Sequence, residues 1–112
     1  MASIYTAQGD NLDEALALAL KAQELAPNNG NILDTLGFIH YQRGQYRKAM
    51  PLLTKATEIL GNDAMIFYHL GLTYAKLDRR DDAVRALGKA LQLQETIPQA
   101  AEIRALIAEL KK

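Results

Sequence analysis

Residues that could carry out chemistry are few in this 112-residue chain. Acyl transfer requires a nucleophile activated by a base, but the only serine is Ser3 and no histidine lies near it in sequence. The absence of cysteine excludes disulfides, thiolate metal sites and thiol nucleophiles. No Gly-x-Gly or Gly-Lys-Ser/Thr sequence occurs, so the glycine-rich loops that bind phosphates are missing. The sequence therefore predicts no enzymatic activity and no cofactor.

His40 and His69 are the remaining candidates for metal binding or catalysis. No His-x3-His spacing and no carboxylate companion in the sequence supports a ligand set around them. The acidic pairs Asp13-Glu14 and Asp81-Asp82 stand at the predicted starts of helices, where the helix dipole stabilises a carboxylate by ~0.3–1 kcal/mol. Packing between helices explains His40, and helix capping explains the acidic pairs, so we expect no metal site and no catalytic residue.

A repeat of thirty-four residues organises the chain around these groups. One clear copy reads Leu33-x2-Leu36-Gly37-x2-His40 and then Ala49-x3-Leu53-x2-Ala56. The copy that follows it reads Phe67-x2-Leu70-Gly71-x2-Tyr74 and then Ala83-x3-Leu87-x2-Ala90. This spacing resembles the tetratricopeptide repeat (TPR) family. The resemblance implies an all-α fold, a right-handed superhelical solenoid of antiparallel helix pairs closed by a C-terminal capping helix.

Clusters of chain-breaking residues predict the boundaries within a single TPR domain. Gln8-Gly9-Asp10 indicates a turn, which truncates the first helix of repeat one and suggests a piece cut from a longer repeat protein. Pro51 predicts a slight bend in the second helix of repeat two, not a break. The predicted units are repeat one (1–29), repeat two (30–63), repeat three (64–97) and the capping helix (98–112), together spanning 1–112.

Composition narrows the classes of partner. Thirteen basic and thirteen acidic side chains cancel, which leaves no broad cationic surface for phosphate contacts, so no nucleic-acid partner is expected. No apolar run approaches the ~20 residues needed to span a bilayer, so we expect no membrane insertion. The sequence leaves cytoplasmic and periplasmic locations open.

The best candidate for function is a surface on the first helices, which in TPR proteins line the concave face. On these helices, the positions beside those that face the core form an apolar strip, which suits a peptide or a partner's helix. The alternative is that Phe38, Tyr41 and Tyr68 are buried against neighbouring helices, leaving a mostly polar groove. The predicted partner-binding residues are Asn31, Asp34, Phe38, Tyr41, Met65, Tyr68 and Leu72.

The TPR resemblance also tests one class of ligand. Chaperone-binding TPR domains hold a terminal carboxylate with a clamp of lysine, asparagine and arginine. In one alignment the clamp positions carry Ser3, Thr35, Met65 and His69, and in the other Asp34, Phe38, His69, Gln99 and Ile103. Because neither set contains lysine and arginine, an acidic C-terminal tail is not the expected ligand. The stretches Asp34–Phe38 and Tyr68–Gly71 further resemble the C-terminal repeats of long bacterial TPR proteins, some of them associated with exopolysaccharide export.

Two other functions remain open from the sequence. The truncated N-terminal face leaves Leu12, Leu16, Ala19 and Leu20 available for self-association, which could produce a homodimer. Alternatively, the chain is the accessory repeat array of a larger enzyme or envelope-assembly protein. The leading prediction is a non-catalytic module that binds a protein or peptide partner.

Overall fold

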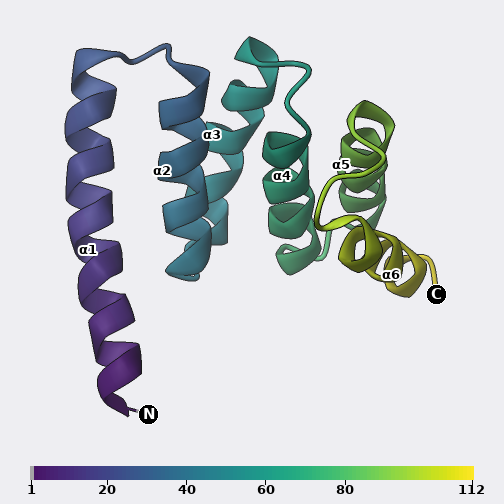
Figure 1. The fold of residues 1–112 in the computed structure, drawn as a ribbon, viewed down its shortest axis with the longest axis horizontal. Coiled ribbons are helices and arrows are strands. Elements are labelled where there is room, and N and C mark those ends of the chain that lie inside the picture. The colour runs from purple at the N-terminus through teal and green to yellow at the C-terminus, as the bar shows by residue number, and fades with distance from the viewer. Residues whose placement is uncertain (1) are drawn as a thin grey trace.

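The computed structural model describes the backbone of residues 2–112 and the side chains of residues 11–112. All regular structure in this part of the chain is helical, in the order α1 (Ala2–Leu25), α2 (Gly30–Gln42), α3 (Tyr46–Ile59), α4 (Ala64–Lys76), α5 (Arg80–Leu93) and α6 (Ala100–Leu110). Helices α2 and α3 form one antiparallel pair and α4 and α5 form the next, stacked side by side (Figure 1). The all-α solenoid predicted from the repeat is confirmed.

The repeated glycines allow the two helices of each pair to approach closely. A Cβ added at Gly37 would lie 2.7 Å from Leu53 Cγ, and one added at Gly71 would lie 2.6 Å from Leu87 Cγ. Such distances are far below van der Waals contact, so any larger side chain would push the helices apart. The leucines that occupy this space, Leu53 and Leu87, are fully buried.

Turns and caps follow the repeat. Within the pairs, the chain reverses through residues with positive φ, +77° at Gly44 and +59° at Asp78. Between the pairs, the side chain of Asn29 accepts a hydrogen bond from the Ile32 amide, and Asp63 accepts one from the Met65 amide. These bonds satisfy amide groups that the first helical turn leaves free, so each first helix begins where the sequence predicts it.

Helix α1 departs from the prediction. The turn expected at Gln8-Gly9-Asp10 does not form, and the backbone continues as one helix of 24 residues. A separate helix of about seven residues would be unstable without many contacts to its neighbours, because starting a helix is unfavourable. Extending an existing helix avoids that cost and adds one hydrogen bond per residue. Figure 1 shows α1 extending well past the end of its neighbour α2.

Pro51 lies inside α3, which continues without interruption from Tyr46 to Ile59, so the predicted absence of a break is confirmed. Its missing amide falls near the helix start, where one lost backbone bond is tolerated more easily. Within the described residues, no helix is both long and apolar enough to cross a membrane.

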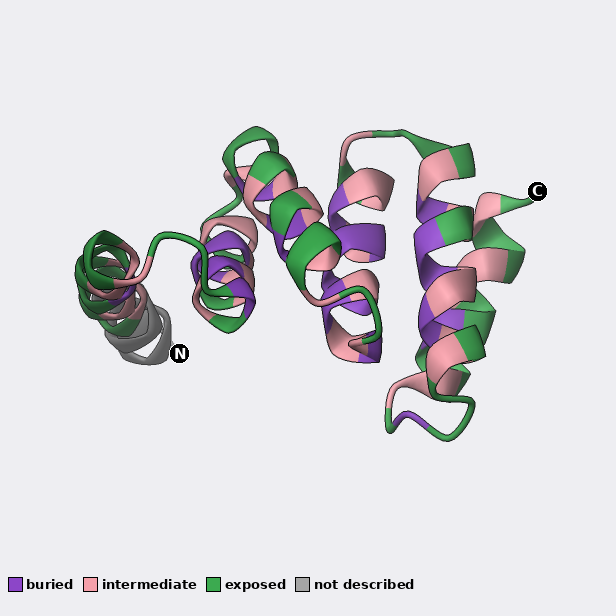
Figure 2. Ribbon diagram, turned by 90° about the horizontal axis from the view of Figure 1, so that it is seen from above, coloured by how far each residue is buried: buried purple, intermediate pink, exposed green. Residues whose placement is uncertain are grey.

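The apolar core runs between the helices from α1 to α6, and Figure 2 shows the buried residues concentrated from α2 onward. At the C-terminal end, α6 closes the core, since Ile103 is fully buried and Ile97 is 2% exposed in the segment leading to it. Among the described side chains of α1, only Ala19 is buried, against Leu36 and Ile39 of α2. The array is therefore covered at one end and open at the other.

Candidate functional site

The thirty-four-residue spacing aligns side chains across three helices. Asp34 of α2 and Tyr68 of α4 share one position of the repeat, and Glu102 of α6 stands a further thirty-four residues along. Phe38, Leu72 and Leu106 share a second position in the same way. Helix α6 therefore occupies the place of another first helix, and the predicted strip continues onto it. We call the seven predicted residues, Asn31, Asp34, Phe38, Tyr41, Met65, Tyr68 and Leu72, the first-helix strip.

A stack of three rings joins α2 to α4 within the strip. The Phe38 ring lies 3.9 Å from the His69 ring, with 17° between their planes, and 5.5 Å from the Tyr41 ring on nearly parallel planes. Tyr41 also meets Tyr46 of α3 edge to face at 5.3 Å. Phe38 and Tyr41 are both half-buried, so part of each remains accessible to a ligand.

A hydrogen bond between Asp34 and His69 holds this stack. Asp34 Oδ1 lies 2.8 Å from His69 Nδ1, and the two side chains are 17% and 11% exposed. A carboxylate only accepts hydrogen bonds, so Nδ1 carries the proton, and the ring orientation against Phe38 is set. The sequence prediction that His69 lacks a carboxylate companion is wrong, because the partner comes from the neighbouring repeat. The described residues nevertheless contain no cluster of three or more metal-binding side chains.

Tyr68 lies beneath the capping helix. It is 7% exposed and packs in the cluster that contains Ile97 and Ile103. Burial, which is the largest cause, and the nearby Glu102 and Tyr41 together raise the pKa of Tyr68 to about 12. For Tyr68, the structure therefore shows the alternative stated from the sequence, burial against a neighbouring helix.

Glu102 of α6 affects the ionisation of tyrosines on α2 and α4. Burial is the main cause of the raised pKa of Tyr41, and the charges of Tyr46 and then Glu102 add to it. The charge of Glu102 is also among the smaller causes of the raised pKa of Tyr68. Helix α6 also shares a core cluster with Tyr68 of α4 through Ile103.

The other three predicted residues lie around this centre. Asn31 is exposed in the first turn of α2. Met65 and Leu72 are half-buried on α4 and pack against the same core cluster as Tyr68. The seven residues thus form a surface that is partly packed and partly open.

Three residues of this surface escaped the sequence prediction, namely His69, Gln99 and Glu102. Gln99 corresponds to Met65 in the repeat, and its side-chain oxygen is buried with no hydrogen-bond partner among the described residues. The signal that could have revealed Gln99 and Glu102 is the thirty-four-residue spacing, carried past Pro98 into the capping helix.

The uncovered face of α1 also differs from the prediction. Ala19 is buried and Leu16 is half-buried against α2, so two of the four residues assigned to self-association are taken up by the array. The most exposed leucines are instead Leu18, at 70%, and Leu25, at 83%. These two lie seven residues apart, and therefore on one side of the helix.

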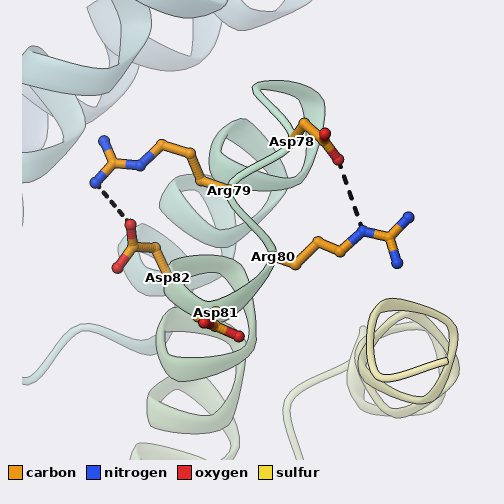
Figure 3. Close-up of a pocket in the computed structure, with 5 residues that line it drawn as sticks. All are labelled: Asp78, Arg79, Arg80, Asp81 and Asp82. Atoms are coloured by element: carbon orange, nitrogen blue, oxygen red, sulfur yellow. Dashed lines mark ion pairs between the residues drawn. The ribbon is translucent and has the colours of Figure 1, made fainter.

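A charged depression at the turn between α4 and α5 is the other notable surface feature (Figure 3). Four of its five charged side chains form ion pairs: Arg79 lies 2.6 Å from Asp82, and Arg80 lies 3.6 Å from Asp78. The Arg79 guanidinium also sits 4.9 Å from the centre of the Tyr74 ring. Because the pairs neutralise each other, the depression presents little net charge to a ligand.

Stacked antiparallel helix pairs with close glycine contacts define a class of helical-repeat protein. A family model described as "Anaphase-promoting complex, cyclosome, subunit 3" matches residues 8–90. The chain belongs to this family of TPR-type proteins, which confirms the resemblance drawn from the motif.

Relatives found by sequence are much longer proteins. The peroxisomal targeting signal receptor of Candida albicans is 32% identical over 87 residues, which cover 74% of this chain and 15% of the relative. The BBSome complex member BBS4 of Bos taurus is 32% identical over 92 residues, covering 82% of this chain and 14% of the relative. The chain therefore spans about one seventh of these two relatives.

Solved structures share the fold. PcrH, in complex with the chaperone binding region of PopD, has a TM-score of 0.81 and 18% identity, covering 96% of this chain and 84% of that one. The Arabidopsis OM64 TPR domain has a TM-score of 0.82 and 19% identity, with coverages of 95% and 85%. YrrB, described as a TPR protein with an unusual peptide-binding site, has a TM-score of 0.78 and 25% identity, with coverages of 88% and 51%.

Proposed function

We propose that this chain is a non-catalytic interaction module that binds a peptide or a partner's helix along the first-helix strip. The observation that carries the proposal is the ring stack of Phe38 on His69 and Tyr41. Phe38 and Tyr41 are only half-buried, whereas rings stacked inside a core would be fully buried. Aromatic side chains held rigidly at a partly open surface lose little entropy on binding and make strong anchors.

The comparisons support a protein or peptide partner. The PcrH structure contains a segment of PopD, and YrrB is described by its peptide-binding site. The relative from Candida albicans is named as a receptor for a targeting signal. Each of these proteins is described as bound to another polypeptide, as having a peptide-binding site or as a receptor, and polypeptide binding is proposed for this chain as well.

Self-association through α1 is the second candidate. The exposure of Leu18 and Leu25 favours it, because two leucines on one helix face in water gain free energy when a second surface covers them. Analytical ultracentrifugation of the native chain and of the Leu18→Ala/Leu25→Ala variant tests this candidate. A mass that rises with concentration only in the native chain would support it.

The main proposal is tested by selecting binders from a displayed library of random peptides against immobilised protein. The groove variant is Phe38→Ala/Met65→Ala, which truncates two half-buried side chains, and the matched control is Leu18→Ala/Leu25→Ala on α1. Tyr68 is left intact because its truncation would open the core. Circular dichroism verifies that both variants remain helical.

We expect the native chain and the α1 control to enrich the same peptides, and the groove variant to lose them. Each anchor should contribute ~2 kcal/mol, so truncation of one lowers affinity about thirtyfold. Equal enrichment by all three proteins would contradict the proposal and move binding away from the strip.

A further inference from the structure

The free side of α1 carries large apolar side chains in water. Leu18 and Leu25 are 70% and 83% exposed, and they lie on the side of the helix largely opposite to Leu16 and Ala19, which pack against α2. Helix α1 stands at the end of the array, with α2 on one side of it (Figure 1). Because α1 has 24 residues, it is about 36 Å long and offers enough length for a second helix to lie along it.

Two opposite charges flank Leu18 on this side. Glu14 precedes Leu18 by four residues and Lys21 follows it by three, and both charged side chains are exposed. Residues at these spacings are neighbours on one helix surface. Neither forms an ion pair with another described side chain, whereas the adjacent acid Asp13 pairs with Arg43. The free side of α1 therefore presents an acid, a leucine and a base in order, and both charges are available to a partner.

This order is complementary to itself when a second copy runs antiparallel. Across a two-fold axis, if Glu14 faces the second copy's Lys21, then Lys21 faces the second copy's Glu14. Both contacts join opposite charges, and the Leu18 side chains of the two copies lie between them. In a parallel pair, Glu14 would face Glu14 and Lys21 would face Lys21, and these like charges repel. The charges thus favour one partner, a second copy, and one orientation.

We infer that α1 pairs with α1 of a second copy of this chain in antiparallel orientation, with Leu18 at the centre and a Glu14–Lys21 pair on each side. This inference rests on self-association through α1, the second candidate function, and it does not involve the first-helix strip. A single pair of helix faces is a small interface, near or below the ~1,200 Å² at which stable complexes begin, so we expect a dissociation constant on the order of 10–100 μM. Unfolding measured at about 1 μM then follows the monomer.

Reversal of single charges tests the pairing. Glu14→Lys and Lys21→Glu each turn both attractive contacts of the pair into repulsive ones. In sedimentation equilibrium over a range of concentrations around the dissociation constant, either change should weaken self-association about tenfold or more. The matched controls are Glu58→Lys and Lys55→Glu, which reverse exposed charges on α3 and should change it less than about twofold. Circular dichroism verifies that all four variants remain helical.

Mixing the two α1 variants gives the sharper readout. One of these chains carries only basic side chains at positions 14 and 21, and the other carries only acidic ones. In a mixed pair, both contacts again join opposite charges, so an equimolar mixture should associate about as strongly as the native chain. The double reversal Glu14→Lys/Lys21→Glu within one chain should restore self-association in the same way, because its two charges have simply changed places.

The outcomes separate this inference from the candidate function on which it rests. If the native chain associates and Leu18→Ala/Leu25→Ala does not, but the charge reversals have no more effect than their α3 controls, the antiparallel pairing is wrong and self-association stands. A mixture no stronger than its separate components would overturn the pairing as well. If the native chain stays monomeric at every concentration, self-association fails and the inference fails with it.

Discussion

Repeats two and three share one skeleton, yet their first helices end up in different environments. At matched positions, α2 carries the half-buried Asp34 and the exposed Thr35, whereas α4 carries the buried Tyr68 and His69. Helix α4 packs against α3 and α5 and shares a core cluster with α6, whereas α2 packs against α3 and α1, whose described side chains are mostly exposed or half-buried. The comparison teaches that the burial of a strip residue depends on its neighbours in the array more than on its position in the repeat.

Truncation at the covered end should have the largest effect. Tyr68→Ala should lower the free energy of unfolding by about 3–5 kcal/mol, because it removes a nearly buried ring from beneath α6. Phe38→Ala, at the half-open position of α2, should lose about 1–2 kcal/mol. Urea unfolding of both variants measures the difference, and equal losses would show that the two helices are equally covered.

Ile103→Ala should reduce the free energy of unfolding by about 2–4 kcal/mol, because Ile103 is the fully buried side chain by which α6 closes the core. Leu18→Ala at the open end should change it by less than about 0.5 kcal/mol, since that side chain is 70% exposed. Thermal unfolding followed by circular dichroism compares the two. A large loss with Leu18→Ala would mean that another surface covers α1 in solution.

The covered end should also be the more sensitive to alkali. The pKa of Tyr68 is raised to about 12 in the folded protein from an unfolded value of 10.0, so its stabilising contribution is complete below pH 10 and is lost as the pH rises toward 12. After allowance for solvent near the hydroxyl, about 1–2 kcal/mol should disappear over this interval. Stability measured at several pH values should fall less steeply in Tyr68→Phe than in the native chain, and parallel curves would contradict the assignment.

The smallest expected effect concerns the bond between the two repeats. Asp34→Ala should lower the free energy of unfolding by about 1 kcal/mol, because the donor on His69 then has no partner at a nearly buried site. Thr35→Ala, at the next and exposed position of the same helix, is the control and should be close to neutral. If the two variants are equally stable, the bond does not hold the repeats together.

Much of the fold was predictable from particular residues. Gly37 and Gly71 identify the close contacts between paired helices, and Asn29 and Asp63 mark the starts of α2 and α4, where the structure shows their capping bonds. The turn at Gln8-Gly9-Asp10 was not predictable in this way. Its composition resembles that of the other turns within the pairs. A turn is stable, however, only where both helices that it joins have enough neighbouring surface to pack against.

The candidate surface was only partly predictable, because it too depends on which helices pack against one another. Helical spacing places Asp34, Phe38 and Tyr68 on one face of their helices, but it carries no information on which neighbouring helix covers that face. The contact of His69 with Asp34, thirty-five residues apart, depends on how successive pairs stack.

The sequence by itself determined the repeat, the helix pairs and the absence of serine, cysteine or glycine-loop chemistry, because these follow from residue type and local spacing. Only the tertiary structure decided that α1 is one continuous helix, that Tyr68 is closed beneath α6 and that Asp34 and His69 of neighbouring repeats meet on the strip. The physical reason is that burial and charge are sums over neighbours distant in the chain, and those neighbours exist only once the pairs have stacked.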